Sequence, residues 1–203
     1  MDLKAHWETG YTTRAPEAVS WYQANPALSL ALIAATGVGK DARLMDVGGG
    51  ASTLVDKLLE AGFAHVTVLD ISPTAMRRAQ ERLGPEARRV QWIEADIRTA
   101  QLPVPVDLWH DRAVFHFLTE AEDRVRYLAV LQRAVPPGGH VIIAAFAPEA
   151  PPKCSGLPVR RYDAEALQRE LGGAFELAEA RTEVHRTPGG VVQPFLYARF
   201  RKT

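Results

Sequence analysis

The strongest constraint on this chain is a repeated alternation between short apolar runs and longer segments with helical spacing. Five apolar runs carry the pattern, at residues 43–47, 65–69, 90–94, 106–110 and 140–146. Runs of this length between turn residues are typical of buried strands, and strands separated by helices pair in parallel. The sequence therefore predicts an α/β fold built on a doubly wound, mostly parallel sheet.

Residues with helix-capping chemistry mark where several of the helices begin. Ser72 before Pro73 predicts an N-cap followed by proline in the first helical turn. Thr119 with Glu122 predicts a capping box, in which each side chain satisfies a backbone N–H of the other. Asp163 predicts the N-cap of a later helix, so helical segments continue beyond the last of the five runs.

The C-terminal part of the chain predicts two strands with no helix between them. They cover about residues 175–182 and 192–201, and the turn at residues 187–190 contains proline and two glycines. A tight turn joins only antiparallel neighbours. One of the two closing strands is therefore expected to run against the rest of the sheet.

Length and composition predict a single domain, residues 1–203, without repeats or linkers. Residues 1–40 form a helical, aromatic segment within it. Lysine plus arginine equals aspartate plus glutamate at 24 each, so the basic excess of a typical nucleic-acid groove is missing. No apolar stretch is long enough to span a bilayer and the start lacks a signal-peptide pattern, so we expect a cytoplasmic protein with no membrane partner.

The sequence offers no cluster of metal ligands. Cys154 is the single cysteine, and the six histidines are scattered along the chain. We therefore predict no metal site. Cys154 is either a reactive thiol, with its pKa lowered by Lys153, or a small buried apolar side chain.

A glycine-rich loop, Asp46-Val47-Gly48-Gly49-Gly50, follows the first predicted strand. In open α/β sheets ligands bind beyond the carboxyl ends of the strands, and glycines let the backbone approach them closely. The loop alone fits several nucleotide-binding folds. A dinucleotide fold would require glycine where Thr53 stands, and no segment matches the phosphate loop of nucleotide triphosphatases.

Two further carboxylates follow the next two predicted strands. Asp70 can accept hydrogen bonds from both hydroxyls of an adenosine ribose, or it can serve the approach to the next helix. Asp96 can accept from an adenine amino group, with Ile71 and Ile97 on the two faces of the ring, or it can cap a turn. With Asp46, three carboxylates then follow three successive strands, which packing alone does not explain.

These residues resemble the motifs of the class I methyltransferases that depend on S-adenosylmethionine (SAM). Residues 44–50 resemble motif I, while Asp70, residues 96–97 and the Pro-Pro-Gly-Gly segment at 136–139 resemble the motifs that follow. The resemblance implies a seven-strand sheet of order 3-2-1-4-5-7-6 with strand 7 antiparallel. It also implies SAM as cofactor and S-adenosylhomocysteine (SAH) as product. Ser52 stands where the family often has a third glycine.

Two shorter resemblances concern the start of the chain and the fourth predicted strand. Trp7 and Tyr11, after His6, resemble the opening of several seven-strand methyltransferases, including the methyltransferase-like lysine enzymes. This segment either folds over the cofactor as a lid or packs its aromatic rings on the sheet. Residues 111–113 resemble a stretch of the thiopurine methyltransferases, which favours a small acceptor.

The residues expected at the cofactor come from the glycine loop, the strand ends and the N-terminal segment. They are Asp46, Gly48, Gly49, Gly50, Asp70, Ile71, Asp96, Ile97, Asp111, Trp7 and Tyr11.

Methyl transfer from a sulfonium is an in-line displacement, so the protein mainly aligns the acceptor and, where needed, removes a proton. His116 is the best candidate base, because it follows the fourth predicted strand; the alternative is a core histidine between Phe115 and Phe117. Asp111 is the second catalytic candidate, since it can position a substrate amine or the cofactor. His110 lies inside the strand and is expected to be structural.

Four residues are expected at the substrate: Arg112, His116, Tyr22 and Arg161. Arg112 either holds an anionic group of the substrate or pairs with Asp111 or Glu120.

The sequence as a whole predicts an enzyme that transfers a methyl group from SAM to a small-molecule N, O or S acceptor. A protein lysine methyltransferase and a non-catalytic SAM-binding module are the alternatives, with a nicotinamide-dependent oxidoreductase a weaker third. Either a monomer or a homodimer is compatible with the sequence.

Overall fold

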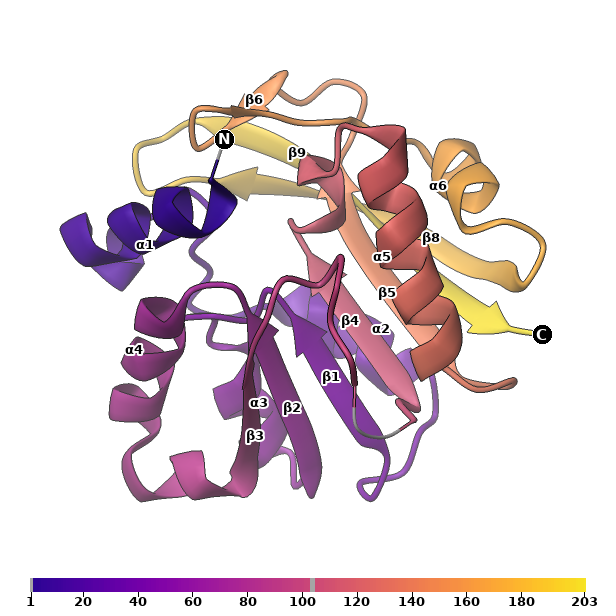
Figure 1. The fold of residues 1–203 in the computed structure, drawn as a ribbon, viewed down its shortest axis with the longest axis horizontal. Helices are drawn as coiled ribbons and strands as arrows, with labels where there is room; N and C mark the ends of the chain where they lie inside the picture. The colour runs from indigo at the N-terminus through magenta and orange to yellow at the C-terminus, as the bar shows by residue number, and fades with distance from the viewer. Residues whose placement is uncertain (1, 103–104) are drawn as a thin grey trace.

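The computed structural model describes residues 2–102 and 105–203, and its centre is a seven-strand sheet. The strands are β1 (Arg43–Val47), β2 (His65–Asp70), β3 (Val90–Glu94), β4 (Leu108–Arg112), β5 (His140–Phe146), β8 (Phe175–Arg186) and β9 (Val192–Lys202). Their order is β3-β2-β1-β4-β5-β9-β8 (Figure 1). The first five pair in parallel, and β9 pairs antiparallel with both β5 and β8. The predicted fold class, strand order and antiparallel strand are confirmed.

Helices cover both faces of this sheet. They are α1 (Leu3–Thr13), α2 (Ala27–Ala35), α3 (Leu54–Glu60), α4 (Pro73–Leu83), α5 (Ala121–Ala134) and α6 (Ala164–Leu171). Short 3-10 turns are η1 (Pro16–Ala18), η2 (Gly84–Arg89) and η3 (Phe115–Phe117), and β6 (Lys153–Cys154) with β7 (Leu157–Pro158) forms a small separate hairpin. No helix among the described residues is long and apolar enough to cross a membrane.

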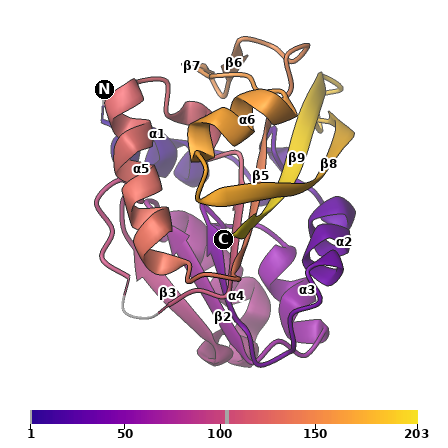
Figure 2. The same cartoon turned by 90° about the vertical axis from the view of Figure 1, so that its right-hand side faces the viewer.

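The core consists of two apolar layers, because successive strand residues point to opposite faces of the sheet. Met45 and Val47 pack on the face covered by α5 and α6, whereas Leu44 packs on the face covered by α2 and α3. Figure 2 shows α5 on one side of the sheet and α2 and α3 on the other. Asp46 shares the face of Leu44, so its carboxylate points toward α2.

Two of the three predicted caps are present. The Ser72 side chain accepts a hydrogen bond from the backbone N–H of Ala75, and Asp163 does the same for Ala166. The predicted capping box at Thr119 is wrong, since α5 takes Glu120 as its N-cap and has no side-chain cap. Its entry is held instead by the Arg124 guanidinium, which donates to the carbonyl groups of Leu118 and Thr119.

The fourth strand lies two residues later than the apolar run predicted. It ends in His110, Asp111 and Arg112, three polar residues, of which the predicted run included only His110. They are accommodated in a central strand because each finds buried hydrogen-bond partners. The shift matters for function, because these residues then stand at the carboxyl edge of the sheet.

Buried hydrogen bonds connect α5 to the end of β4. The Tyr127 hydroxyl donates to Asp111 Oδ2 at 2.7 Å and accepts from Trp109 Nε1 at 2.9 Å. All three side chains are fully buried. Burial and the neighbouring Asp111 carboxylate raise the pKa of Tyr127 well above its usual value, so the hydroxyl stays a donor.

We expect Tyr127→Phe to lower the free energy of unfolding by about 2 to 3 kcal/mol, because it leaves a buried indole N–H without a partner and removes one hydrogen bond from a buried carboxylate. Urea unfolding measures this change. Tyr162→Phe is the matched control: the Tyr162 hydroxyl is buried in the same layer and makes no hydrogen bond among the described residues. An equal loss in both variants would contradict the role assigned to the Tyr127 hydroxyl.

Candidate active site

A large, mostly apolar cavity lies at the carboxyl edge of the sheet, under α1 and the segment that leads to Trp21. It encloses about 800 Å³, part of which is open to solvent. Val47, Gly48 and Leu69 line it from the ends of β1 and β2. Most of its surface is apolar, which is typical of small-molecule sites. A second, smaller cavity adjoins it along Gly48 and contacts the other face of the glycine loop.

The loop after β1 requires glycine because neighbouring side chains press against it. Gly48 has φ +67°, and a Cβ atom there would lie 2.1 Å from Cγ2 of Val114. A Cβ atom at Gly49 would lie 2.5 Å from Oδ2 of Asp46, and one at Gly50 would lie 2.6 Å from Oδ2 of Asp70. Two of the predicted carboxylates therefore lie directly against the loop backbone.

Asp46 is held in a buried chain of hydrogen bonds across three elements. Its Oδ1 lies 2.8 Å from His110 Nδ1 on the neighbouring strand, and His110 Nε2 lies 2.9 Å from the Ser29 hydroxyl on α2. Asp46 Oδ2 is buried without a partner among the described residues. Because Asp46 lines the second cavity, this oxygen can accept a hydrogen bond from a cationic group bound there.

Asp70 ends β2 and lines the large cavity together with Ile71. Its Oδ1 accepts from the backbone N–H of Ser72 at 2.8 Å. Burial raises the pKa of Asp70 to about 7, and the nearby Asp46 carboxylate adds to the effect. Such a carboxylate gains from a ligand that donates hydrogen bonds to its ionised form.

Asp96 and Ile97 line the same side of the cavity. Asp96 Oδ1 accepts from the backbone N–H of Arg98, and both of its oxygens accept from the Arg98 guanidinium. Burial favours the neutral form of Asp96, but the hydrogen bonds from Arg98 outweigh it and lower the pKa. The turn-capping alternative is thus realised here, and the ion pair with Arg98 is one that the sequence pattern did not indicate.

The predicted lid residues Trp7 and Tyr11 also line the large cavity, and Tyr11 borders both cavities. Trp21 Nε1 donates to the Tyr11 hydroxyl at 3.1 Å. Trp7 packs edge-to-face between Trp21 and Phe117, with ring centroids at 5.5 and 5.0 Å. The aromatic rings of the N-terminal segment therefore pack on one another while they line the cavity.

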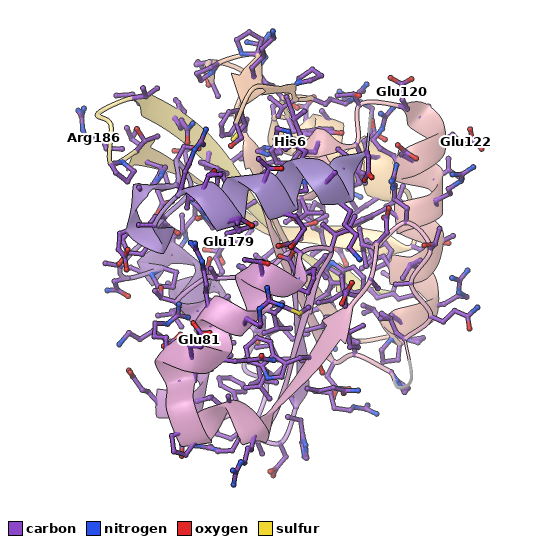
Figure 3. The ribbon with its side chains drawn as sticks, turned by 60° about the vertical axis from the view of Figure 1, so that its left-hand side comes forward. His6, Glu81, Glu120, Glu122, Glu179 and Arg186 are labelled. Carbon is purple, nitrogen blue, oxygen red and sulfur yellow. The ribbon has the colours of Figure 1, made fainter. Side chains whose placement is uncertain are left out.

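Hydrogen bonds connect helix α1 to the start of α4 beside this cavity. The Glu8 carboxylate accepts from the hydroxyl groups of Ser72 and Thr74 and from the backbone N–H of Thr74. Figure 3 shows the two helices one above the other, α1 with His6 and α4 with Glu81. The cover over the cavity is thus held by the same helix start that carries the Ser72 cap.

The structure does not bring His116 to either cavity. Its ring is fully buried against Phe117, Phe146 and Phe195. Nδ1 accepts from the backbone N–H of Phe146 at 3.2 Å, and Nε2 has no partner among the described residues. Burial lowers the pKa of His116 to about 3, so the ring is neutral. This placement matches the core alternative.

Asp111 also lies away from both cavities. Its carboxylate accepts from the backbone N–H groups of Val114 and Phe115 and from Tyr127, so it orders the turn after β4. Burial raises the pKa of Asp111 to about 6.

The remaining substrate candidates are divided between different places. Arg112 lines both cavities, whereas Tyr22 lines only the second one. Arg161 is an exposed side chain that donates to the carbonyl groups of Pro148 and Ala150. The lining residues that sequence reasoning missed include Leu3, Trp21, Arg98, Val114, Phe117 and Leu118. No motif marks them as cavity residues, because contacts across the sheet edge leave no periodic signal.

A protein-family model described as "Methyltransferase domain" matches residues 45–141, which include the glycine loop, Asp70 and Asp96. The chain is 29% identical over 171 residues to an uncharacterized methyltransferase of Mycobacterium tuberculosis. That match covers 77% of this chain and 83% of the relative.

Two solved structures have the same fold. A SAM-dependent methyltransferase from Anabaena variabilis matches 100% of this chain and 96% of its own, with a TM-score of 0.78 at 14% identity. A 1,6-didemethyltoxoflavin-N1-methyltransferase from Burkholderia thailandensis, solved with 1,6-didemethyltoxoflavin and SAH bound, matches 99% of this chain and 87% of its own. Its TM-score is 0.73 at 20% identity.

We expect Gly48→Ala to lower the free energy of unfolding by about 2 to 4 kcal/mol, because the new methyl group meets Val114 and the backbone is left-handed. In a Val114→Ala background the steric conflict is removed, and the loss from Gly48→Ala should fall to about 1 to 2 kcal/mol. Urea unfolding of the four proteins in this cycle measures both values. Equal losses in the two backgrounds would contradict the contact with Val114.

Proposed function

We propose that this chain is a class I SAM-dependent methyltransferase and that it transfers the methyl group of SAM to a small-molecule N, O or S acceptor. The observation that carries the proposal is the lining of the large cavity. It combines Asp70, Asp96 and Gly48, which we assign to a carboxylate end, with Trp7 and Phe117, which we assign to an aromatic end. The carboxylate end fits an adenosine, and the aromatic end fits a small apolar molecule.

The residues at the carboxylate end fit the cofactor. Asp70 would accept from the ribose hydroxyls, and Ile71 and Ile97 would contact the adenine ring. Asp46, with its unpartnered Oδ2, would accept from the ammonium group of the methionine part next to Gly48. When bound, SAM supplies a sulfonium-activated methyl group, and these residues orient it toward the aromatic end.

The aromatic end supports a small acceptor rather than a protein side chain on an open surface. Trp7, Trp21 and Phe117 lie against one another and close this part of the cavity from the side of α1. A peptide would need a groove that continues on both sides of the target residue. The Burkholderia structure with the same fold holds a small heterocycle, which agrees with this assignment for the present chain.

The chain's contribution to the reaction is then positioning and exclusion of water. Two residues with ionisable hydroxyl or thiol groups line the aromatic end, Tyr11 and Cys154. Burial raises the pKa of both groups, so neither is a base near neutral pH. We therefore propose that the acceptor needs no base from the protein. It attacks with a lone pair that is already free, and the surrounding rings hold it in line with the methyl group.

The proposal predicts selective binding and turnover. SAM and SAH at 100 times their dissociation constants should each stabilise the protein by about 2.7 kcal/mol, whereas NAD should give no shift. Thermal unfolding with and without each compound measures this. A screen of small N, O and S acceptors, read out by SAH release, should yield at least one substrate. Absence of a shift with both SAM and SAH would overturn the proposal.

The raised pKa of Asp70 predicts how SAH binding depends on pH. Ribose hydroxyls donate to the ionised carboxylate, so protonation of Asp70 below about pH 7 competes with binding. Affinity for SAH should rise between pH 5 and 7, by up to about tenfold per pH unit, and level off above. Calorimetric titration at several pH values measures this dependence. Asp70→Asn should bind more weakly and without this slope, and an unchanged slope in that variant would exclude Asp70 as its source.

A further inference from the structure

Arg112 is a fixed cation at the boundary of the two cavities. Its Nε donates to the Tyr197 hydroxyl at 2.8 Å, and its Nη1 donates to the Trp21 carbonyl oxygen at 3.0 Å. The guanidinium carbon lies 4.5 Å from the centre of the Phe195 ring. Three contacts from three different segments therefore fix the plane of the guanidinium group.

The third nitrogen of this group is left without an acceptor. Nη2 of Arg112 is buried and makes no hydrogen bond among the described residues. No carboxylate of the described residues lies within ion-pair distance of Arg112. The Tyr197 hydroxyl stands between Arg112 and Glu183, to which it donates at 2.9 Å. A buried cationic N–H without an acceptor is costly, so a ligand oxygen that accepts from it is favoured.

Arg112 lies on the acceptor side of the site. Its guanidinium group covers Phe195 of β9, whereas the cofactor motifs follow β1, β2 and β3. The aromatic rings of Trp7, Trp21 and Phe117 line the same end of the cavity. An ammonium group placed there would be repelled by Arg112, while a flat apolar ring would be covered on several sides.

We propose that the methyl acceptor is a small aromatic anion. Its ring lies among Trp7, Trp21 and Phe117, and its anionic oxygen, a carboxylate or a phenolate, accepts from Arg112 Nη2. This inference rests on the proposed function, because it names the substrate class of the same site. It gives Arg112 the anion-binding alternative expected from the sequence.

The test uses SAH-loaded wild-type protein and three probes of nearly equal shape: benzoate, neutral benzamide and the cation of benzylamine. Ligand-observed NMR titration should show benzoate binding at least tenfold more tightly than benzamide, with no measurable binding of benzylammonium. Phenolate-forming nitrophenols, titrated in parallel, distinguish the two kinds of oxygen anion. Equal affinities for benzoate and benzylammonium, or no binding of any anionic probe, would overturn the proposal.

Variants then locate the anion. Arg112→Gln should weaken benzoate binding at least tenfold and leave SAH affinity within about threefold of wild type. Arg126→Gln, which removes an exposed arginine paired with Glu122 on α5, is the matched control and should change neither affinity.

Two other results have distinct meanings. If Arg112→Gln lost SAH affinity and kept benzoate affinity, Arg112 would hold the cofactor's carboxylate instead and the inference would be wrong. If wild-type protein failed to bind SAH at all, the proposed function itself would fail. The wild-type probe series keeps the inference testable even where a variant does not fold.

Discussion

The site depends on one buried carboxylate that does not line it. Asp111 accepts hydrogen bonds from the backbone N–H groups of Val114 and Phe115 and from the Tyr127 hydroxyl. These bonds stabilise a turn in which Ala113 has φ +68°, a left-handed conformation that costs a non-glycine residue about 1 to 2 kcal/mol. These hydrogen bonds offset the cost of the left-handed conformation, so the turn after β4 depends on them.

The turn after β4 positions both the glycine loop and Arg112. Val114 is brought against Gly48, so that only glycine fits at the first position of the loop after β1. Arg112, on the other side of Ala113, is brought to the boundary of the two cavities. The glycine loop and the anion-binding arginine are therefore not independent features. They are two consequences of how the end of β4 is hydrogen-bonded.

Prediction from the sequence succeeded where a feature is local or periodic. The apolar runs gave the strands, Ser72 and Asp163 gave caps whose partners lie three residues away, and Asp70 stood at the end of a recognisable strand. It failed where a long-range partner decides. Thr119 does not cap α5, because the helix begins one residue later with Glu120 as its N-cap, and Arg124 donates to the carbonyl groups before it. Strand β4 was placed too early because its last residues are polar. Their burial depends on Ser29, Tyr127 and Tyr197, which no window of sequence around β4 contains.

Unpartnered buried atoms give the strongest argument for how the ligands are arranged. Folding leaves few buried polar groups without a hydrogen bond, because each costs about 1 to 3 kcal/mol. Here an acceptor, Asp46 Oδ2, and a donor, Arg112 Nη2, both belong to residues that border the second cavity, and Asp70 holds a raised pKa at the far end of the large one. A cofactor with an ammonium group and ribose hydroxyls satisfies Asp46 and Asp70, and an anionic acceptor satisfies Arg112.

Burying these polar groups without partners lowers the stability of the free protein. Each ligand contact removes that penalty, and the difference contributes to the free energy of binding. The order of the groups along the cavities then sets the acceptor on the β9 side and the cofactor on the β2 side, with the glycine loop between them.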